Sequence, residues 1–437
     1  MEINVRIDST KIVVPIYDGN ISSSSTLQFI PLSVFDKYTY NTHAAQIFAY
    51  HPPTPSNATI ESGLKRVLSE YREFAGRLGE DEKGEPIIVL NDKGAKLVEA
   101  SVDSKLDDVM PSEPSPVLRS LYPSLKEAEE LVLVQLTSFA CGSLVVGFIV
   151  HHSVADGNST FKFLVDWGKV TRGVDISSLP LHDRTIFKPR NPPRFEFENR
   201  GVKFIQKLLK DCPDNVENNN NIVVQKVHFT ADFLSKIKAM TKPYSTYDTL
   251  VAHLWRVLTK ARGLNGFETS HVIVSVNGRM RMARKVPNEY LGNMVLWAFP
   301  SAKINDISHE QLPYVAKRVH DAISNVNNDY FESFIDFATY KLEKEEVCPT
   351  TTLSDKCISC PNLEVNSWVR FPIYDVDFGG GSPYMFLPSY FPMEGMIYLL
   401  PSAARDGTID AFVFLFQNNV SKFKQIVYSL DHGRSRL

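Results

Sequence analysis

The spacing of apolar residues along the chain predicts a mixture of strands and helices. Alternating or short apolar runs, typical of strands, cover residues 4–17, 46–50, 222–229, 271–276, 365–378, 397–400 and 408–416. Apolar positions three and four residues apart, typical of amphipathic helices, cover residues 60–75, 159–171, 202–209, 230–240, 245–262, 310–326 and 420–428. Two hairpins are expected, at 86–100 around Asn91-Asp92 and at 130–150 around Cys141-Gly142.

One stretch interrupts this pattern and suggests a boundary between domains. Residues 183–200 hold three prolines and many charges, and four consecutive asparagines stand at 218–221. A chain of 437 residues is too long for one ordinary core. We therefore expect an N-terminal domain over 1–182, a crossover over 183–221 and a C-terminal domain over 222–437. Since strands and helices mix in both halves, the expected class is α/β or α+β.

The sequence HHSVADG, at residues 151–157, follows an apolar run that reads as a buried strand. His152 titrates near neutral pH and is the usual type of general base. Asp156, four residues later, could orient this base or brace the loop. Ser153 and Ser159 lack the strained elbow that a covalent nucleophile requires, so direct attack by a bound acceptor is the simpler mechanism. Taken alone, the motif also fits ordinary histidines at a strand end.

Composition and charge narrow the function without identifying it. Hydrophobic residues make up 43% and charged residues 22%, as in soluble globular proteins. The net charge of −3 gives no electrostatic case for nucleic acid or an anionic membrane. No apolar run nears the ~18–20 residues of a membrane span, and the N-terminus shows no secretory pattern. The five scattered cysteines fit free thiols, and the lone Cys357–Cys360 pair lacks partners for a zinc site, so no metal is expected.

A second motif, DFGGG, occupies Asp377 to Gly381 and precedes Ser382-Pro383. No Lys-Ser or Lys-Thr pair and no helix pattern follows, so a phosphate-binding loop is excluded. A structural turn after a strand is the remaining interpretation.

The two motifs together resemble the plant BAHD acyltransferases, and the resemblance covers nearly the whole chain. Supporting stretches are YREFAGRL (71–78), STYDTLVAHLWR (245–256), SVNGRMR (275–281) and YLGN (290–293). It implies the two-domain fold of chloramphenicol acetyltransferase, with mixed sheets, an active-site channel between the domains and an acyl-CoA co-substrate. No permanently bound cofactor is implied. The enzyme is expected to act as a monomer.

The resemblance also implies residue roles. His152 would take a proton from the acceptor, which attacks the thioester carbonyl. Asp156 would be structural and pair with Arg279 of the second domain, rather than orient the base. Asp377, Gly379 and Gly381 would shape the interface away from the chemistry. Ser245 and Thr246 would lie near CoA. Trp368 would lie beside the reacting carbonyl, where its indole N–H could support the oxyanion, and Phe48 and Tyr40 could stack on the acyl ring or pack in the core.

Two positions depart from the family pattern. Asn277 stands where an acid is usual, and Gly380 stands where the family has tryptophan. A glycine there removes packing surface and adds backbone freedom. We predict reduced rigidity of this turn without loss of activity.

Residues 32–43, 151–173 and 366–379 most resemble the branch that acylates amines such as agmatine, putrescine or tryptamine with hydroxycinnamoyl groups. Relatives that acylate shikimate or quinate carry an arginine about a dozen residues before Asn366, where this chain has TLSD (352–355). A carboxylate would suit a cationic acceptor, and the candidates are Asp355, Asp36 and Glu394. The alternatives are an O-acyltransferase for an alcohol, including benzoyl donors, and a non-catalytic binding protein. The ending Ser435-Arg436-Leu437 is close to a peroxisomal address, so the expected compartment is the cytoplasm, with the peroxisome as alternative.

Overall fold

The computed structural model describes residues 3–17, 28–197, 222–343, 360–390 and 392–430. The chain forms two compact units. Unit 1 contains residues 1–188, 286–294 and 371–390, and unit 2 contains 189–285, 295–370 and 391–437. Two short segments that the sequence analysis placed in the C-terminal domain, 286–294 and 371–390, therefore lie in unit 1. The predicted helix at 202–209 falls outside the described residues.

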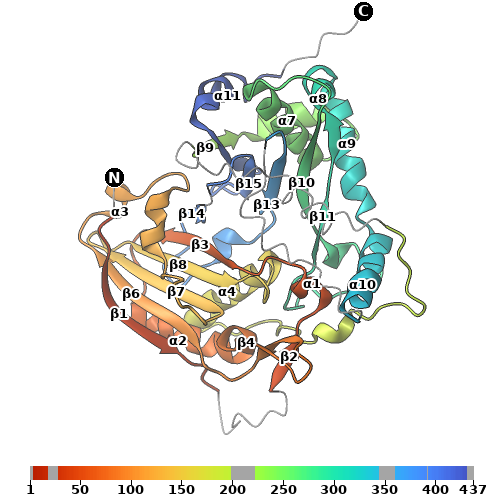
Figure 1. Cartoon of the computed structure of the whole chain (residues 1–437). Helices are drawn as coiled ribbons and strands as arrows, with labels where there is room; N and C mark the ends of the chain where they lie inside the picture. The colour runs from red at the N-terminus through yellow and green to blue at the C-terminus, as the bar shows by residue number, and fades with distance from the viewer. Residues whose placement is uncertain (1–2, 18–27, 198–221, 344–359, 391, 431–437) are drawn as a thin grey trace, which may run out of the picture. The chain divides into compact units, whose positions relative to one another are not determined.

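Unit 1 is built on a six-stranded mixed sheet in the order β1-β6-β7-β8-β3-β14 (Figure 1). Its strands are β1 (Arg6–Val13), β3 (His43–Tyr50), β6 (Ala95–Val102), β7 (Val132–Phe139), β8 (Leu144–His151) and β14 (Met385–Pro388). A three-stranded sheet holds β2 (Phe29–Pro31), β4 (Arg77–Glu80) and β5 (Pro86–Val89). Short helices are α1 (Val34–Lys37), η1 (Arg72–Ala75), α3 (Leu106–Val109), η2 (Pro116–Leu121), η3 (Arg184–Ile186) and η7 (Ile373–Asp375).

Two longer helices, α2 (Asn57–Glu70) and α4 (Gly157–Thr171), pack together in unit 1. The Trp167 indole of α4 donates to the Ile60 carbonyl of α2 at 3.0 Å. A Cβ on Gly63 would lie 1.9 Å from the Thr171 hydroxyl, so only glycine permits this close approach. Fully buried aromatics join α4 to the sheet, because Phe163 and Trp167 both contact Phe148 of β8.

Unit 2 has a mixed sheet in the order β11-β10-β13-β15-β16-β9, with β12 beside β10. Its strands are β9 (Ile222–Phe229), β10 (Thr269–Asn277), β11 (Val295–Ala298), β12 (Ser301–Lys303), β13 (Leu363–Ser367), β15 (Met396–Pro401) and β16 (Ile409–Phe416). Its helices are α6 (Ala231–Met240), α7 (Thr246–Ala261), η5 (Gly278–Met280), α8 (Ile304–His309), α9 (Leu312–Asn325), α10 (Asn328–Glu343), η8 (Gln417–Asn419) and α11 (Val420–Ile426).

Helix α7 is the centre of the helical layer in unit 2 and contacts α6, α8, α9 and α11. It packs on the sheet through Trp255, whose indole donates to the Ser270 hydroxyl of β10 at 2.9 Å. Since side chains alternate along a strand, α7 covers the face that carries Ser270, Val272 and Val274. Ile273 and Ser275 point to the other face.

Several expected elements need correction. The hairpin predicted at 86–100 is wrong, because β5 pairs with β2 and β4 while β6 pairs with β1 and β7. The strand predicted at 365–378 ends at Ser367, and a turn with η7 follows. Helix α10 and strands β11, β12 and β14 were not predicted. The hairpin of β7 and β8 is confirmed, with Gly142 at φ 81° in its turn.

Candidate active site

His152 lies in a loop between β8 and α4 that contains no helix or strand residue from 152 to 156. Its backbone N–H donates to the Thr42 carbonyl at 2.8 Å. Its Nδ1 lies 3.3 Å from the Thr39 hydroxyl, and its ring contacts that of Tyr40 edge-on, with centroids 5.7 Å apart. When Nδ1 carries the proton and donates to Thr39, Nε2 keeps its lone pair as a base requires. Thr39 lies outside the motif of His152, and no local pattern in the sequence pointed to this contact.

Burial lowers the pKa of His152 below its usual value, while Asp156, Asn293 and Asp36 act in the opposite direction. The imidazole is therefore neutral at pH 7 and able to accept a proton. His151 lies in a different place. As the last residue of β8 it shares the face of Ile149 and contacts His43 edge-on. Burial lowers its pKa to about 3, so it does not titrate near neutral pH.

Asp156 caps the helix that follows the loop. One carboxylate oxygen accepts from the Ser159 N–H at 3.0 Å, and the other accepts from the Met294 N–H at 3.0 Å. Asp156 is 2% exposed, and these contacts within unit 1 fit a structural role. Its pairing with Arg279 stays a prediction, because that residue lies in unit 2. There, Asn277 accepts from the Arg279 N–H at 2.9 Å and stands in the position of the usual acid.

The DFGGG segment is attached to the far end of α4. Asp377 accepts from the N–H groups of Gly379 and Gly381 at 2.7 and 2.9 Å. It also pairs with Arg172, which follows α4, at 3.3 Å. Since α4 has 15 residues, its ends lie about 22 Å apart at 1.5 Å per residue. The turn thus stands a helix length away from the loop of His152.

The other predicted site residues are divided between the two units. Phe48 is fully buried and packs on Phe161 and Phe386, so it belongs to the core of unit 1 rather than to an open acyl pocket. Trp368 in unit 2 is half-buried beside Tyr398, with centroids 5.1 Å apart. Ser245 caps α7 in a reciprocal pair with Asp248, and Thr246 begins that helix.

The acceptor candidates need revision. Asp36 is 1% exposed, and both its oxygens are bonded within unit 1. Glu394 is buried and held by both ends of the Arg262 guanidinium at 2.7 and 2.8 Å. These engaged carboxylates do not suit an incoming cation. Asp355 lies outside the described residues.

A carboxylate that the sequence analysis missed is Glu364 of β13. It is 6% exposed and lies on the sheet face opposite α7, where Asn366 and Tyr398 also point. The Asn366 side-chain amide donates to it at 2.9 Å. Burial raises the pKa of Glu364, and no cation among the described residues offsets this. The only sequence signal was an acid at a strand position, two residues before Asn366.

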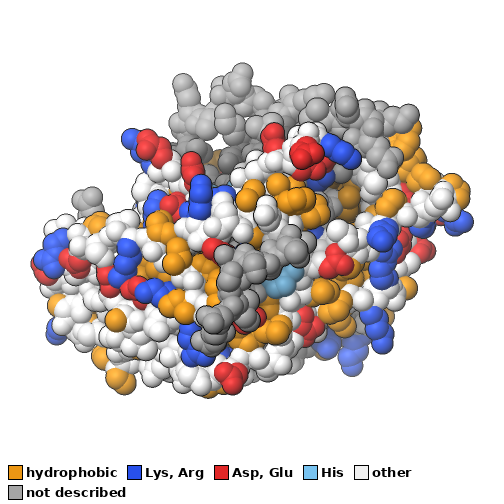
Figure 2. All heavy atoms as spheres, turned by 90° about the horizontal axis from the view of Figure 1, so that it is seen from below, with side chains coloured by type: hydrophobic (Ala, Val, Ile, Leu, Met, Phe, Trp, Pro, Cys, Tyr) orange, Lys and Arg blue, Asp and Glu red, His pale blue; other side chains and the backbone are white. Residues whose placement is uncertain are grey.

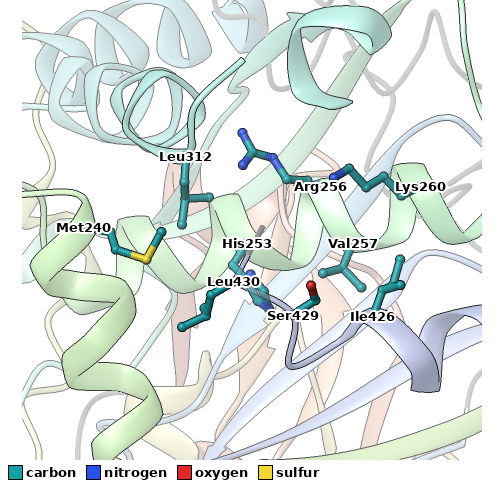
Figure 3. A pocket seen from close by; sticks show the side chains of 9 residues that line it. All are labelled: Met240, His253, Arg256, Val257, Lys260, Leu312, Ile426, Ser429 and Leu430. Atoms are coloured by element: carbon teal, nitrogen blue, oxygen red, sulfur yellow. The ribbon is translucent and has the colours of Figure 1, made fainter. Parts of the chain in front are cut away.

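A small hollow in unit 2 is lined by none of the predicted site residues (Figure 3). Two of its polar lining residues are already bonded, since His253 contacts the Val427 carbonyl at 2.7 Å and Arg256 donates to the Ile307 carbonyl at 2.9 Å. Over the coloured surface in Figure 2, acidic and basic side chains are interspersed, in keeping with the small net charge.

Comparison with known proteins assigns the chain to a family. The model of the Transferase family matches residues 3–430. The chain belongs to this family. The BAHD resemblance is thereby confirmed.

Curated relatives include putrescine hydroxycinnamoyltransferase 3 of Oryza sativa subsp. japonica, 46% identical over 98% of this chain and 100% of the relative. Agmatine coumaroyltransferase-1 of Hordeum vulgare is 45% identical with the same coverage. Shikimate O-hydroxycinnamoyltransferase of Nicotiana tabacum is 30% identical over 89% of this chain and 92% of the relative.

Solved structures confirm the fold. Vinorine synthase matches with a TM-score of 0.71 at 21% identity, covering 96% of each chain. The F. graminearum TRI101 complex with coenzyme A and T-2 mycotoxin matches with a TM-score of 0.73 at 18% identity, covering 91% of this chain and 97% of that one. The predicted chloramphenicol acetyltransferase-like architecture is confirmed.

The geometry around Gly380 gives a first testable prediction. A Cβ there would lie 2.2 Å from the Pro53 carbonyl oxygen, so the backbone turn occupies the space that a side chain would need. We expect Gly380→Ala, and more so Gly380→Trp, to lower the free energy of unfolding by about 1–3 kcal/mol through overpacking. Thermal melting measures the change.

The matched control is Ser382→Ala, at an exposed position in the same loop, which should melt like the wild type. A Gly380→Trp variant that melts at a higher temperature than the wild type would contradict this view of the turn.

Proposed function

We propose that this protein transfers a hydroxycinnamoyl-type acyl group from a CoA thioester to an amine, with His152 as general base. The observation that carries the proposal is a neutral, half-buried His152 with Nδ1 held by Thr39, in a chain whose full-length relatives are named for putrescine and agmatine acylation. Acyl-CoA is a co-substrate here, and no permanent cofactor takes part.

The reaction proceeds by direct attack. The acceptor nitrogen attacks the thioester carbonyl carbon, and Nε2 of His152 takes a proton from that nitrogen. The carbon–sulfur bond then breaks, the CoA sulfur receives the proton from the imidazolium, and the amide is released. In this proposal, the Trp368 indole N–H supports the oxyanion, Tyr40 stacks on the acyl group, and Ser245 and Thr246 lie near CoA.

An amine acceptor sets a chemical condition. Alkylammonium groups have pKa values near 10.4 and cannot attack while protonated. Burial and a neutral base favour the free amine at the reacting end. A second cationic group at the far end of the acceptor can remain charged, and it then needs a counter-charge.

We assign that counter-charge to Glu364. Its carboxylate has one side-chain donor, Asn366, and no ion pair among the residues that the structure describes. A bound ammonium or guanidinium group would supply the missing cation and favour the ionised carboxylate. The positions of Trp368 and Tyr398 on the same sheet face would give the methylene chain of a diamine an aromatic surface.

The role of His152 is tested by His152→Ala. We expect kcat with p-coumaroyl-CoA and agmatine or putrescine to fall at least 100-fold, because a positioned base contributes about 10²–10⁴ in rate. Release of free CoA measures the rate. His309→Ala, on the surface of unit 2, is the control and should retain activity. If His152→Ala keeps full activity, the mechanism is wrong. If the wild type turns over alcohols alone, the reaction forms an ester and not an amide.

The role of Glu364 is tested by Glu364→Gln, which keeps the shape and the bond from Asn366. We expect KM for agmatine or putrescine to rise about 10- to 100-fold, since a hydrogen bond to a charged group contributes about 1.5–3 kcal/mol. KM for the acyl-CoA should stay within about twofold, because the thioester does not contact this carboxylate in the proposed arrangement.

Two comparisons make this test specific. Glu332→Gln removes the carboxylate partner of Arg284 elsewhere in unit 2 and should leave KM unchanged. Hexylamine, which lacks a second cation, should show the same KM in wild type and Glu364→Gln. An equal rise with hexylamine, or no rise with the diamines, would refute the assignment.

Cellular location and assembly state complete the proposal. Within the described residues, no helix is long and apolar enough to cross a bilayer. We propose a cytoplasmic monomer, with the peroxisome as the alternative because of Ser435-Arg436-Leu437, which lie outside the described residues. Imaging of a fusion with a free C-terminus, compared with one lacking the last three residues, distinguishes the two compartments.

A further inference from the structure

The loop that carries His152 is held by a buried ion pair that the proposed reaction does not use. Asp36 and Arg184 are 1% and 2% exposed, and the Arg184 Nη1 lies 2.9 Å from the Asp36 Oδ2. The same carboxylate oxygen accepts from the N–H and hydroxyl of Ser33 at 2.8 and 2.7 Å. Ser33 and Asp36 thereby form the capping box of α1.

The other oxygen of Asp36 reaches a different segment of the chain. Its Oδ1 accepts from both the backbone N–H and the side-chain amide of Asn293, at 2.8 and 2.9 Å. The Asn293 side chain is thus fixed in orientation by a charged acceptor. Its amide nitrogen also donates to the carbonyl oxygen of His152 at 2.8 Å.

The ion pair also reaches the loop at a second point. Arg184 Nη2 donates to the Val154 carbonyl oxygen at 2.7 Å. Residues 152–156 belong to neither a strand nor a helix, so these two carbonyls have no partners from regular secondary structure. Buried carbonyls need hydrogen bonds, and the side chains of Asn293 and Arg184 provide them on either side of Ser153.

We propose that Asp36, Arg184 and Asn293 form a positioning unit that fixes the backbone at His152 and so aims its imidazole at the acceptor. The inference rests on the proposed role of His152 as base. It reassigns Asp36 from acceptor recognition to positioning. Because displacement of a catalytic group by about 1 Å can cost about 100-fold in rate, the unit should influence kcat more than substrate binding.

Asn293→Ala tests the link most directly, since it removes the amide that joins Asp36 to His152. We expect kcat with p-coumaroyl-CoA and agmatine to fall 10- to 100-fold, with both KM values within threefold. If this variant does not fold, Asn293→Gln displaces the same amide by one methylene and serves the same comparison. A folded variant with kcat within threefold of the wild type would overturn the proposal.

Ser159→Ala is the matched control on the same segment. The Ser159 hydroxyl donates to the Gly292 carbonyl at 2.9 Å and accepts from the Gly292 N–H at 3.1 Å, whereas the side-chain bond to the His152 carbonyl comes from Asn293. We expect the melting temperature of this variant to fall about as far as that of Asn293→Ala, with kcat near that of the wild type. An equal loss of kcat in both variants would show a general loss of packing and would contradict positioning.

Variants of the ion pair separate an effect on melting temperature from an effect on kcat. Arg184→Met leaves Asp36 buried without its cation, so both melting temperature and kcat should fall. The double variant Asp36→Asn with Arg184→Met leaves no buried charge unpaired, so its melting temperature should recover relative to that of Arg184→Met. We expect kcat to remain at least tenfold below the wild type, because the bond to Val154 is absent. Recovery of kcat together with stability would overturn the proposal.

These outcomes also distinguish failure of the inference from failure of the proposed function. If His152→Ala abolishes activity while Asn293→Ala does not alter kcat, the base is correct and the positioning unit is wrong. If His152→Ala retains activity, the proposed function fails irrespective of Asn293.

Discussion

The structure of the loop at His152 depends on a buried charge pair. Removing two ions from water costs several kcal/mol per ion, and their attraction offsets this only when the remaining polar atoms are also bonded. The Asp36 oxygens meet that condition through Ser33 and Asn293, and Arg184 donates to the Val154 carbonyl, whereas the Arg184 Nε has no hydrogen-bond partner among the described residues. Loss of one partner of such a pair typically costs about 3–5 kcal/mol, so the loop geometry is enforced rather than incidental. A base on an irregular loop needs this kind of support, because no ladder of backbone hydrogen bonds holds it.

Burial has opposite consequences for the two titratable groups that the proposed reaction needs. It lowers the pKa of His152 and so keeps the imidazole neutral. It raises the pKa of Glu364, because burial disfavours the charged carboxylate. A bound cation would stabilise that carboxylate. As the pH falls through the raised pKa, Glu364 takes up a proton and loses its attraction for a diamine. As the pH falls through the lowered pKa of His152, the base is lost. Both groups therefore lose their proposed function as the pH falls, whereas more of the reacting amine is unprotonated as the pH rises.

Much of the local structure was predictable because local patterns determine it. The apolar run before His151 gave β8, and the spacing after Asp156 gave α4, whose N-cap the Asp156 carboxylate provides. The failures have non-local causes. Residues 86–100 look like a hairpin, yet β5 and β6 pair with different partners, and pairing partners cannot be read from alternation. Strand β14 and the 286–294 segment cross into unit 1, which local sequence patterns do not reveal.

In the candidate site, too, local patterns point to some residues and non-local contacts decide the others. His152 could be proposed as the base from its motif and the family resemblance, whereas Asp36 and Glu364 could not be told apart as acids, because burial and partners decide their roles. Asp36 accepts four hydrogen bonds from Ser33 and Asn293 and forms an ion pair with Arg184, and Glu364 accepts one side-chain hydrogen bond, from Asn366. A buried carboxylate whose acceptor positions are filled stabilises the structure, whereas one with unfilled acceptor positions can bind a ligand.

Helix α4 connects the two motifs that identify the family. Its N-terminus is capped by Asp156 of HHSVADG, and Arg172 just beyond its C-terminus pairs with Asp377 of DFGGG. Gly168 lets the DFGGG backbone lie against the helix, because a Cβ there would come within 2.5 Å of the Asp377 carbonyl oxygen. At Gly380, where the family has tryptophan, the missing side chain leaves no cavity at the Cβ position, because the Pro53 carbonyl oxygen fills that space. The turn is fixed near the C-terminal end of α4, and the loop of His152 directly precedes the N-terminal end of this helix, which is about 22 Å long. The helix therefore ties the DFGGG motif to the loop of the proposed base.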